Sequence, residues 1–247
     1  MKKNFLNLDN LDLPIYRIFS YERFINLIKS KENGLVRPRK WEDPFENFFL
    51  KCNFIDTSTG DEVDISKISD SWYGQCWSMK EESDAMWRIY SPEKNGIKIK
   101  TTIRKLFESF YDNKDRFASL KYYIGAVQYK KRLEIENSLK GESFMNLALG
   151  GQGYNFARTL LTKRTEFDHE NEVRLLYFDT DDTYINNDYV NFHFPWDNLI
   201  EEIVLDPRLD EAEVDKLTKA INIVLGTSRI KTYQSELYKV TFPSLPL

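Results

Sequence analysis

Apolar residues recur with two different spacings along this chain, and the two spacings alternate irregularly. Apolar residues recur at every second position in segments such as 96–101 and 171–178, which is the spacing of strands. They recur every three to four positions in segments such as 21–34 and 208–226, which is the spacing of amphipathic helices. Because strands and helices do not follow a regular strand–helix rhythm, the pattern predicts an α+β fold with much antiparallel sheet.

The bulk composition is that of a soluble globular protein. Of 247 residues, 41% are hydrophobic and 30% are charged, enough for a sizeable core. We find no repeat, low-complexity tract or convincing linker, so we expect a single domain over residues 1–247. No secretory signal and no apolar run of about eighteen residues is present, so we expect a cytoplasmic protein with no membrane contact.

Charge and cysteine content exclude several classes of site. The net charge is −4, so no global basic field indicates nucleic acid, although segments 121–132 and 157–164 are locally basic. Two cysteines and two histidines support neither a disulfide scaffold nor a Cys/His zinc site. The glycine-rich stretch 150–153 lacks the lysine and Ser/Thr of a phosphate-binding loop, so it is a weak signal.

An arginine lies in an apolar strand near the N-terminus. The segment IYRIFS (15–20) alternates Ile15, Arg17 and Phe19 on one face and Tyr16 and Ile18 on the other. An arginine on an apolar face is costly unless it is paired. Either a buried carboxylate within the fold or the phosphate of a ligand would satisfy Arg17.

A cysteine–serine strand precedes a short aromatic helix in residues 75–100. Ser78 ends the apolar strand, and Ser83 or Glu81 starts the helix. Trp87 and Tyr90 are three residues apart, so they share a helix face. That face either packs into the core or forms a wall for a planar ligand ring.

Two further segments each have a structural and a functional interpretation. In WEDPFE (41–46), Pro44 fixes a turn, which is either a corner held by Asp43 or a pocket rim bearing Asp43 or Glu46. In HENEVRLLY (169–177), Glu170, Glu172 and Arg174 alternate with apolar residues that face the core. By itself this second pattern is typical of a solvated face; the alternative is a catalytic strand beside a cleft.

The joint order of these motifs resembles a bacterial domain family of uncharacterised function. The resemblance covers about residues 15–210 and rests on four segments: LVRPRKWEDPFE, QCWSMKEESDAMWRIYSPEKNGIKIK, ENEVRLLYF and IEEIVLDPR. The order arginine-in-strand, serine-in-strand, then E-x-E is also similar to the mono-ADP-ribosyltransferase superfamily. This chain has one serine where better-known members carry a Ser-Thr-Ser triplet. The second resemblance implies an ADP-ribosyltransferase-like fold, a central, mostly antiparallel split sheet flanked by helices.

The superfamily resemblance also implies an activity and a set of site residues. NAD would be the substrate, with no metal required. Glu172 would be catalytic and Glu170 would orient or deprotonate the acceptor. From its place beside them, we expect Arg174 to be an ion-pair partner that fixes the glutamates rather than a ligand contact. The implied NAD-binding residues are Arg17 at the pyrophosphate with its neighbour Tyr16, Ser78 at the nicotinamide ribose, and Trp87 or Tyr90 as a stacking ring.

The expected activity is transfer of ADP-ribose to a macromolecule, either a protein or a nucleic acid. Such an enzyme would be a toxin or phage-defence effector, and an antitoxin or immunity partner would accompany it. Two alternatives remain open at the level of sequence. One is an NAD glycohydrolase on the same fold, and the other is a non-catalytic nucleotide-binding sensor module.

Overall fold

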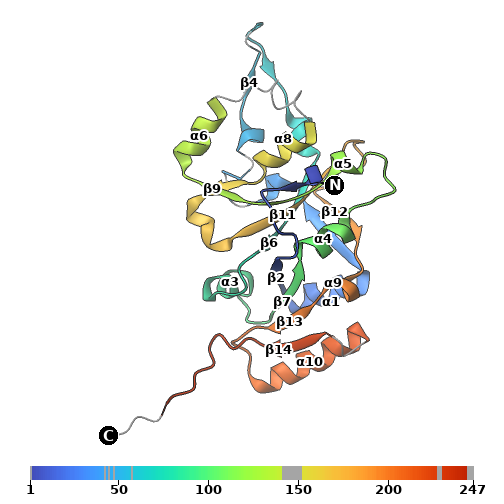
Figure 1. The fold of residues 1–247 in the computed structure, drawn as a ribbon, viewed down its shortest axis with the longest axis vertical. Helices are drawn as coiled ribbons and strands as arrows, with labels where there is room; N and C mark the ends of the chain where they lie inside the picture. The colour runs from blue at the N-terminus through green and yellow to red at the C-terminus, as the bar shows by residue number, and fades with distance from the viewer. Residues whose placement is uncertain are drawn as a thin grey trace. The chain divides into compact units, whose positions relative to one another are not determined.

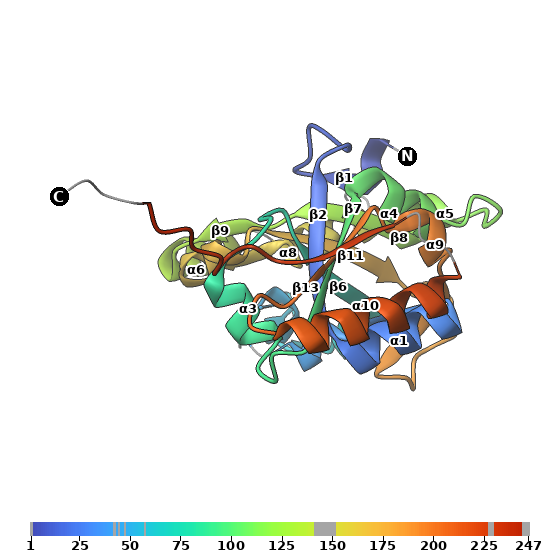
Figure 2. The ribbon, with the colours of Figure 1, turned by 90° about the horizontal axis from the view of Figure 1, so that it is seen from below.

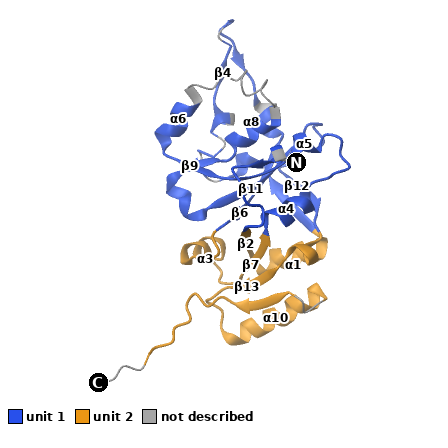
Figure 3. Cartoon of the chain, viewed as in Figure 1, with its two compact units in different colours: residues 1–13, 32–79, 102–194 blue, residues 14–31, 80–101, 195–247 orange. Residues whose placement is uncertain are grey.

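The computed structural model contains both helices and strands (Figures 1 and 2). It describes residues 2–41, 43, 45–46, 48–56, 58–140, 152–226 and 230–243. The chain divides into two compact units, each built from separate stretches of sequence (Figure 3). Unit 1 comprises residues 1–13, 32–79 and 102–194, and unit 2 comprises residues 14–31, 80–101 and 195–247. The expectation of a single domain stays a prediction.

Unit 1 is built on a mostly antiparallel sheet. Its strands, in spatial order, are β1 (Phe5–Leu6), β8 (Tyr122–Ala126), β11 (Glu172–Phe178), β6 (Trp72–Ser78), β3 (Glu32–Val36) and β12 (Tyr189–His193). Only the β1–β8 pair among these is parallel. Because β11 lies between β6 and β8, it has a hydrogen-bonded neighbour along both edges.

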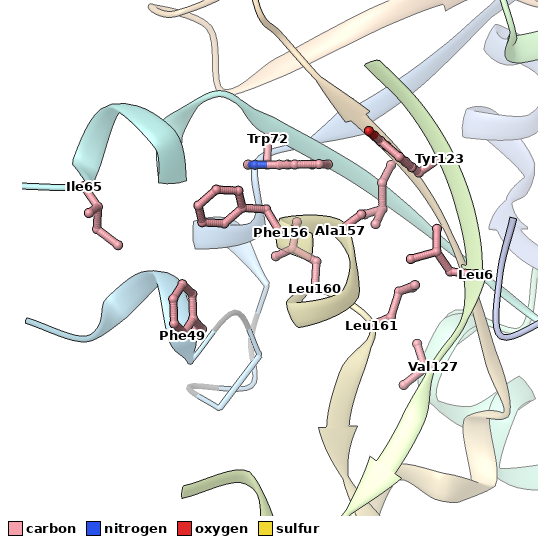
Figure 4. Close-up of a cluster of buried hydrophobic side chains, with 11 residues drawn as sticks. Leu6, Phe49, Ile65, Trp72, Tyr123, Val127, Phe156, Ala157, Leu160 and Leu161 are labelled. Atoms are coloured by element: carbon pink, nitrogen blue, oxygen red, sulfur yellow. The ribbon is translucent and has the colours of Figure 1, made fainter. Parts of the chain in front are cut away.

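Both faces of β11 are covered within unit 1. On one face, Tyr177 meets the aromatic rings of Phe110 from helix α4 (Ile103–Phe110) and Phe192 from β12. On the other face, Leu176 joins a buried cluster with Phe156 from helix α8 (Gln152–Thr159) (Figure 4). The alternate side chains of β11 therefore face two separate cores.

The rest of unit 1 consists of short elements. These are the parallel pair β9 (Gln128–Lys130) and β10 (Thr162–Arg164), the hairpin β4 (Phe54–Ile55) and β5 (Glu62–Val63), helices α2 (Ser66–Asp70), α5 (Ala118–Lys121) and α6 (Arg132–Lys140), and 3₁₀ turns η1 (Lys2–Asn4), η2 (Pro38–Lys40), η3 (Phe49–Lys51) and η4 (Thr165–Glu170).

Unit 2 has its own strands and helices. Its strands follow the order β2 (Pro14–Ser20), β7 (Gly96–Thr102), β13 (Glu202–Leu205) and β14 (Lys231–Gln234), where β7–β13 is antiparallel and β13–β14 is parallel. Its helices are α1 (Tyr21–Ser30), α3 (Asp84–Tyr90), α9 (Trp196–Leu199) and α10 (Glu211–Leu225). Helices α1 and α10 lie side by side (Figure 2).

The helices of unit 2 begin and end at residues that are typical of helix caps. The hydroxyls of Ser20 and Ser83 accept backbone N–H bonds at the N-termini of α1 and α3. Gly226 closes α10 in the left-handed conformation, as predicted. Helix α1 ends at Lys31, with a φ of 55°, and Asn33 and Gly34 lie within β3, so the helical spacing over residues 21–34 extends past the end of the helix.

The structure confirms an α+β fold with a mostly antiparallel sheet. Residues 122–130 form two strands, β8 and β9, and the polar segment 56–70 contains β5 and α2. In the glycine-rich stretch 150–153, Gly150 and Gly151 lie outside the described residues.

Candidate functional site

Five charged side chains from separate parts of unit 1 form a buried group, here called the carboxylate cluster. Its members are Glu46, Lys163, Glu170, Glu172 and Arg174, each between 0% and 7% exposed. Such burial is rare for charged side chains unless they are paired. The cluster is therefore the chemically most distinctive part of unit 1.

Lys163 joins the three carboxylates. Its Nζ lies 3.0 Å from Oε1 of Glu46 and 2.8 Å from Oε1 of Glu172, and it also donates to Oε2 of Glu170. The three donors of one ammonium group thus match three acceptors. Lys163 comes from β10, and Glu172 is the first residue of β11.

Arg174 holds the second oxygen of Glu172. Its Nε lies 2.7 Å from Oε2 of Glu172, and its guanidinium also lies 2.6 Å from Oε1 of Glu46. It donates a third bond, of 2.8 Å, to the backbone oxygen of Leu160, just after helix α8. Trp41 covers the guanidinium, with its ring centroid 4.4 Å from the guanidinium carbon. Arg174 therefore pairs with Glu172 and Glu46, and the expectation that it is an ion-pair partner is confirmed for Glu172.

The WEDPFE segment is both a corner and part of the cluster. Asp43 accepts a backbone bond from Phe45 at 3.0 Å, which confirms the structural corner. The same carboxylate pairs with Arg164 at 2.8 Å, and Glu46 enters the cluster. Glu42, Pro44 and Asn47 lie outside the described residues.

The pKa values of the two glutamates in the E-x-E pair are shifted in opposite directions. Burial, together with the neighbouring Glu172, raises the pKa of Glu170 to about 7, although Lys163 opposes this. Burial also disfavours ionised Glu172, but Arg174, Glu170 and Lys163 outweigh it and hold the pKa of Glu172 below its usual value. The cluster has three carboxylates against two cations, so a proton on Glu170 makes it neutral.

Ser78 and Tyr129 fix the backbone around the two glutamates. The hydroxyl of Ser78 donates a 2.6 Å bond to the backbone oxygen of Glu170, and Ser78 lies opposite Glu172 in the β6–β11 register. The hydroxyl of Tyr129 accepts the backbone N–H of Glu172 at 2.8 Å. Two side-chain hydrogen bonds therefore fix the backbone at the start of β11.

In unit 2, three of the predicted NAD-binding residues line one narrow pocket. Tyr16, Arg17 and Trp87 line it together with Lys98. Trp87 is fully buried, and its Nε1 donates to Glu82 at 2.7 Å. Tyr90 is 43% exposed and is not among the lining residues, so Trp87 and Tyr90 do not share one environment.

Two expectations about the E-x-E segment are wrong. Glu170 is not on the strand, because Asn171 adopts a φ of 43° and separates turn η4 from β11. The face of Glu172 and Arg174 is not solvated, because helix α8 and the corner at residues 41–46 cover it. Ser78 lies against Glu170 and Glu172, whereas Arg17 belongs to unit 2, so the expected common site of Arg17, Ser78 and the two glutamates stays a prediction.

Sequence reasoning missed Lys163 and Tyr129. Both lie in three-residue strands too short to show a period, and each lies in a segment interpreted only as locally basic or as a longer strand. Among the described residues, no group of three or more His, Cys, Asp or Glu side chains is arranged to hold a metal ion. No helix in the described part of the chain is long and apolar enough to cross a bilayer.

Comparisons with known proteins give one family match and several structural resemblances. The family model described as "Protein of unknown function (DUF2971)" matches residues 86–175, which include Trp87, Glu172 and Arg174. A comparison with curated proteins found no match.

Two of the similar solved structures are of DarT from Thermus sp. 2.9. The complex with NAD⁺ has a TM-score of 0.41 and 13% identity, over 92% of this chain and 97% of that one. The complex with ADP-ribosylated single-stranded DNA has a TM-score of 0.41 and 12% identity, over 94% of this chain and 97% of that one.

Proposed function

We propose that this chain is an NAD-dependent ADP-ribosyltransferase with Glu172 as its catalytic carboxylate. The observation that carries the proposal is the buried carboxylate cluster, in which Lys163 binds both Glu170 and Glu172 and Arg174 binds Glu172. Two carboxylates with separated pKa values can divide the roles of charge stabiliser and proton acceptor. Glu172, with a lowered pKa, is the stabiliser, and Glu170, with a pKa of about 7, is the proton acceptor.

Glu172 suits a reaction in which positive charge develops on a sugar. When the bond between nicotinamide and the ribose breaks, nicotinamide leaves with the bonding electrons and the ribose becomes oxocarbenium-like. A fixed carboxylate stabilises this charge without reorganisation. One oxygen of Glu172 accepts a bond from Lys163 and the other accepts a bond from Arg174, so the carboxylate is held in one orientation.

Glu170 suits activation of the acceptor. A nucleophilic oxygen or nitrogen of the acceptor attacks the ribose carbon and must lose its proton as the new bond forms. A base with a pKa of about 7 is well matched to this transfer near neutral pH. The acceptor is a protein or a nucleic acid, and water in its place would give the glycohydrolase reaction.

The NAD-binding residues form part of the same proposal. Arg17, Tyr16, Ser78, Trp87 and Tyr90 are assigned on the order of the sequence motifs. The buried ring of Trp87 and the exposed ring of Tyr90 give these two residues unequal access to a ligand. A role as a toxin or phage-defence effector with an antitoxin belongs to the proposal as well.

Incubation of the purified chain with NAD labelled in the adenylate portion and a bacterial lysate tests this function. We expect labelled macromolecules with the wild type and at least a hundredfold less with Glu172→Gln. Glu166→Gln is the matched control, because Glu166 is an exposed glutamate on η4 just before the cluster. Sensitivity of the label to protease or to nuclease identifies the class of acceptor.

Three other outcomes are informative. Nicotinamide release without labelled macromolecules would assign the glycohydrolase instead. Saturable NAD binding without turnover would assign the sensor module. Equal labelling by wild type and a folded Glu172→Gln variant would overturn the role of Glu172.

A further inference from the structure

A cavity of about 330 Å³ lies in unit 1, on the opposite side of β9 and β10 from the carboxylate cluster. Strand alternation explains this placement. In the β9–β10 register, Tyr129 pairs with Lys163, and both reach the cluster. Gln128 pairs with Thr162, and both line the cavity. The two short strands thus separate two chemically different environments.

The walls of the cavity combine flat rings with amide and hydroxyl groups. Phe45 and Phe48 line it and are stacked, with ring centroids 5.5 Å apart and an interplanar angle of 11°. The guanidinium groups of Arg132 and Arg164 lie over Phe45, at 5.2 Å and 4.7 Å from its centroid. Gln128 and Asn155 add side chains that carry both a donor and an acceptor.

The charge in the cavity is entirely positive. Lys130 and Arg158 line it, and no acidic side chain is among its described lining residues. Neither cation forms an ion pair within the described part of the chain. Nearby cations are already used, because Arg164 pairs with Asp43 and Arg132 pairs with Glu136. Lys130 and Arg158 are therefore available to an anion, for which arginine offers a planar fork.

We infer that this cavity binds a nucleoside monophosphate, with its base against the ring of Phe48 and its phosphate at Lys130 and Arg158. Amide side chains match the mixed donors and acceptors of base edges, and aromatic rings stack on any base. The volume is at the low end of the range of about 300–1,000 Å³ for ligand sites, which suits one nucleotide unit rather than a dinucleotide such as NAD. The inference does not depend on the proposed function.

Calorimetric titration of the full chain with the four common ribonucleoside monophosphates tests the site. Adenosine, which lacks the phosphate, and inorganic phosphate, which lacks the nucleoside, are titrated separately as the two parts of the ligand. We expect saturable binding of at least one mononucleotide and at least tenfold weaker binding of either half, which is about 1.4 kcal/mol. A 5′-phosphorylated tetranucleotide is titrated in the same way. It shows whether the natural ligand is a free nucleotide or the phosphorylated end of a strand.

Amino-acid substitutions test whether the nucleotide binds in this cavity. Lys130→Gln combined with Arg158→Gln should weaken the mononucleotide at least tenfold and leave adenosine unchanged. Ile135→Trp should abolish binding of both, because Ile135 is a buried lining residue and a larger ring fills the cavity. Lys131→Gln is the matched control, since Lys131 is an exposed neighbour that does not line the cavity.

The site is overturned if neither a mononucleotide nor the tetranucleotide binds the wild type. It is also overturned if Lys131→Gln weakens binding as much as the double variant, or if phosphate alone binds as tightly as the nucleotide. Glu172→Gln should retain mononucleotide binding even though it loses NAD turnover. A failure of the proposed function therefore leaves a different signature from a failure of this inference.

Discussion

Lys163 and Glu172 are joined by a 2.8 Å ion pair in the interior of unit 1, although they lie in different strands. The same ammonium also binds Glu46 and Glu170. Its pKa is raised because the three carboxylates outweigh the effect of burial, so Lys163 stays charged. Lys163 is thus the residue that allows three carboxylates to occupy one buried site.

Replacing Lys163 should destabilise the protein strongly. Lys163→Met removes the ammonium that Glu170 binds and leaves Arg174 paired with Glu172 and Glu46, and removing one partner of a buried ion pair typically costs about 3–5 kcal/mol. Urea unfolding at pH 7 measures this loss. Lys131→Met, at an exposed position, should change the free energy of unfolding by less than about 0.5 kcal/mol. Adding Glu170→Gln to Lys163→Met should recover part of the loss; strict additivity would contradict the direct contact.

The raised pKa of Glu170 predicts a dependence of stability on pH. Between about pH 4.5 and pH 7 the folded state holds a proton on Glu170 that the unfolded chain has released. The stabilisation is therefore complete at low pH and is lost as the pH rises through about 7. The slope from this group approaches about 1.4 kcal/mol per pH unit.

Comparing the wild type with Glu170→Gln across pH 4.5–8 isolates this effect. The wild type should lose stability relative to the variant as the pH rises. Glu172 acts in the opposite direction at lower pH, because its lowered pKa makes its stabilisation disappear as the solution becomes acidic. A wild type that gains stability relative to Glu170→Gln as the pH rises would contradict the assignment.

Gly74 on β6 leaves room for Trp41 above Arg174. A Cβ at residue 74 would lie 2.6 Å from Cζ2 of Trp41, closer than two such atoms can approach. Gly74→Ala should displace the indole from Arg174 and destabilise the protein by about 1–3 kcal/mol. Gly34→Ala is the control, because its Cβ would meet only the flexible side chain of Asn191, at 3.0 Å. Equal thermal stability of the two variants would show that Trp41 is not held in place.

Much of the fold follows from periodicity, whereas the cluster does not. Helix α10 and strand β7 have enough residues to show their period, so their positions could be predicted from the sequence. Alternation on β11 correctly separated Glu172 and Arg174 from Val173 and Leu175. It could not show that helix α8 covers the charged face, because alternation defines faces and not their neighbours.

The other residues of the carboxylate cluster could not be predicted from the sequence for a related reason. Lys163 is nine residues away on a three-residue strand, and Glu46 reaches the site from a corner more than a hundred residues earlier. Sequence spacing carries no information on such contacts. Glu170 was placed on the strand because nothing in the sequence marks Asn171 as left-handed, apart from the tolerance of asparagine for that conformation.

The most direct test of the proposed centre is the rate of nicotinamide release from NAD by the purified chain. We expect measurable release by the wild type and by Glu166→Gln, and a rate at least a hundredfold lower for Glu172→Gln. Thermal unfolding of the same samples verifies that each variant is folded. Equal rates of nicotinamide release from the wild type and a folded Glu172→Gln would contradict the claim that the carboxylate cluster cleaves NAD.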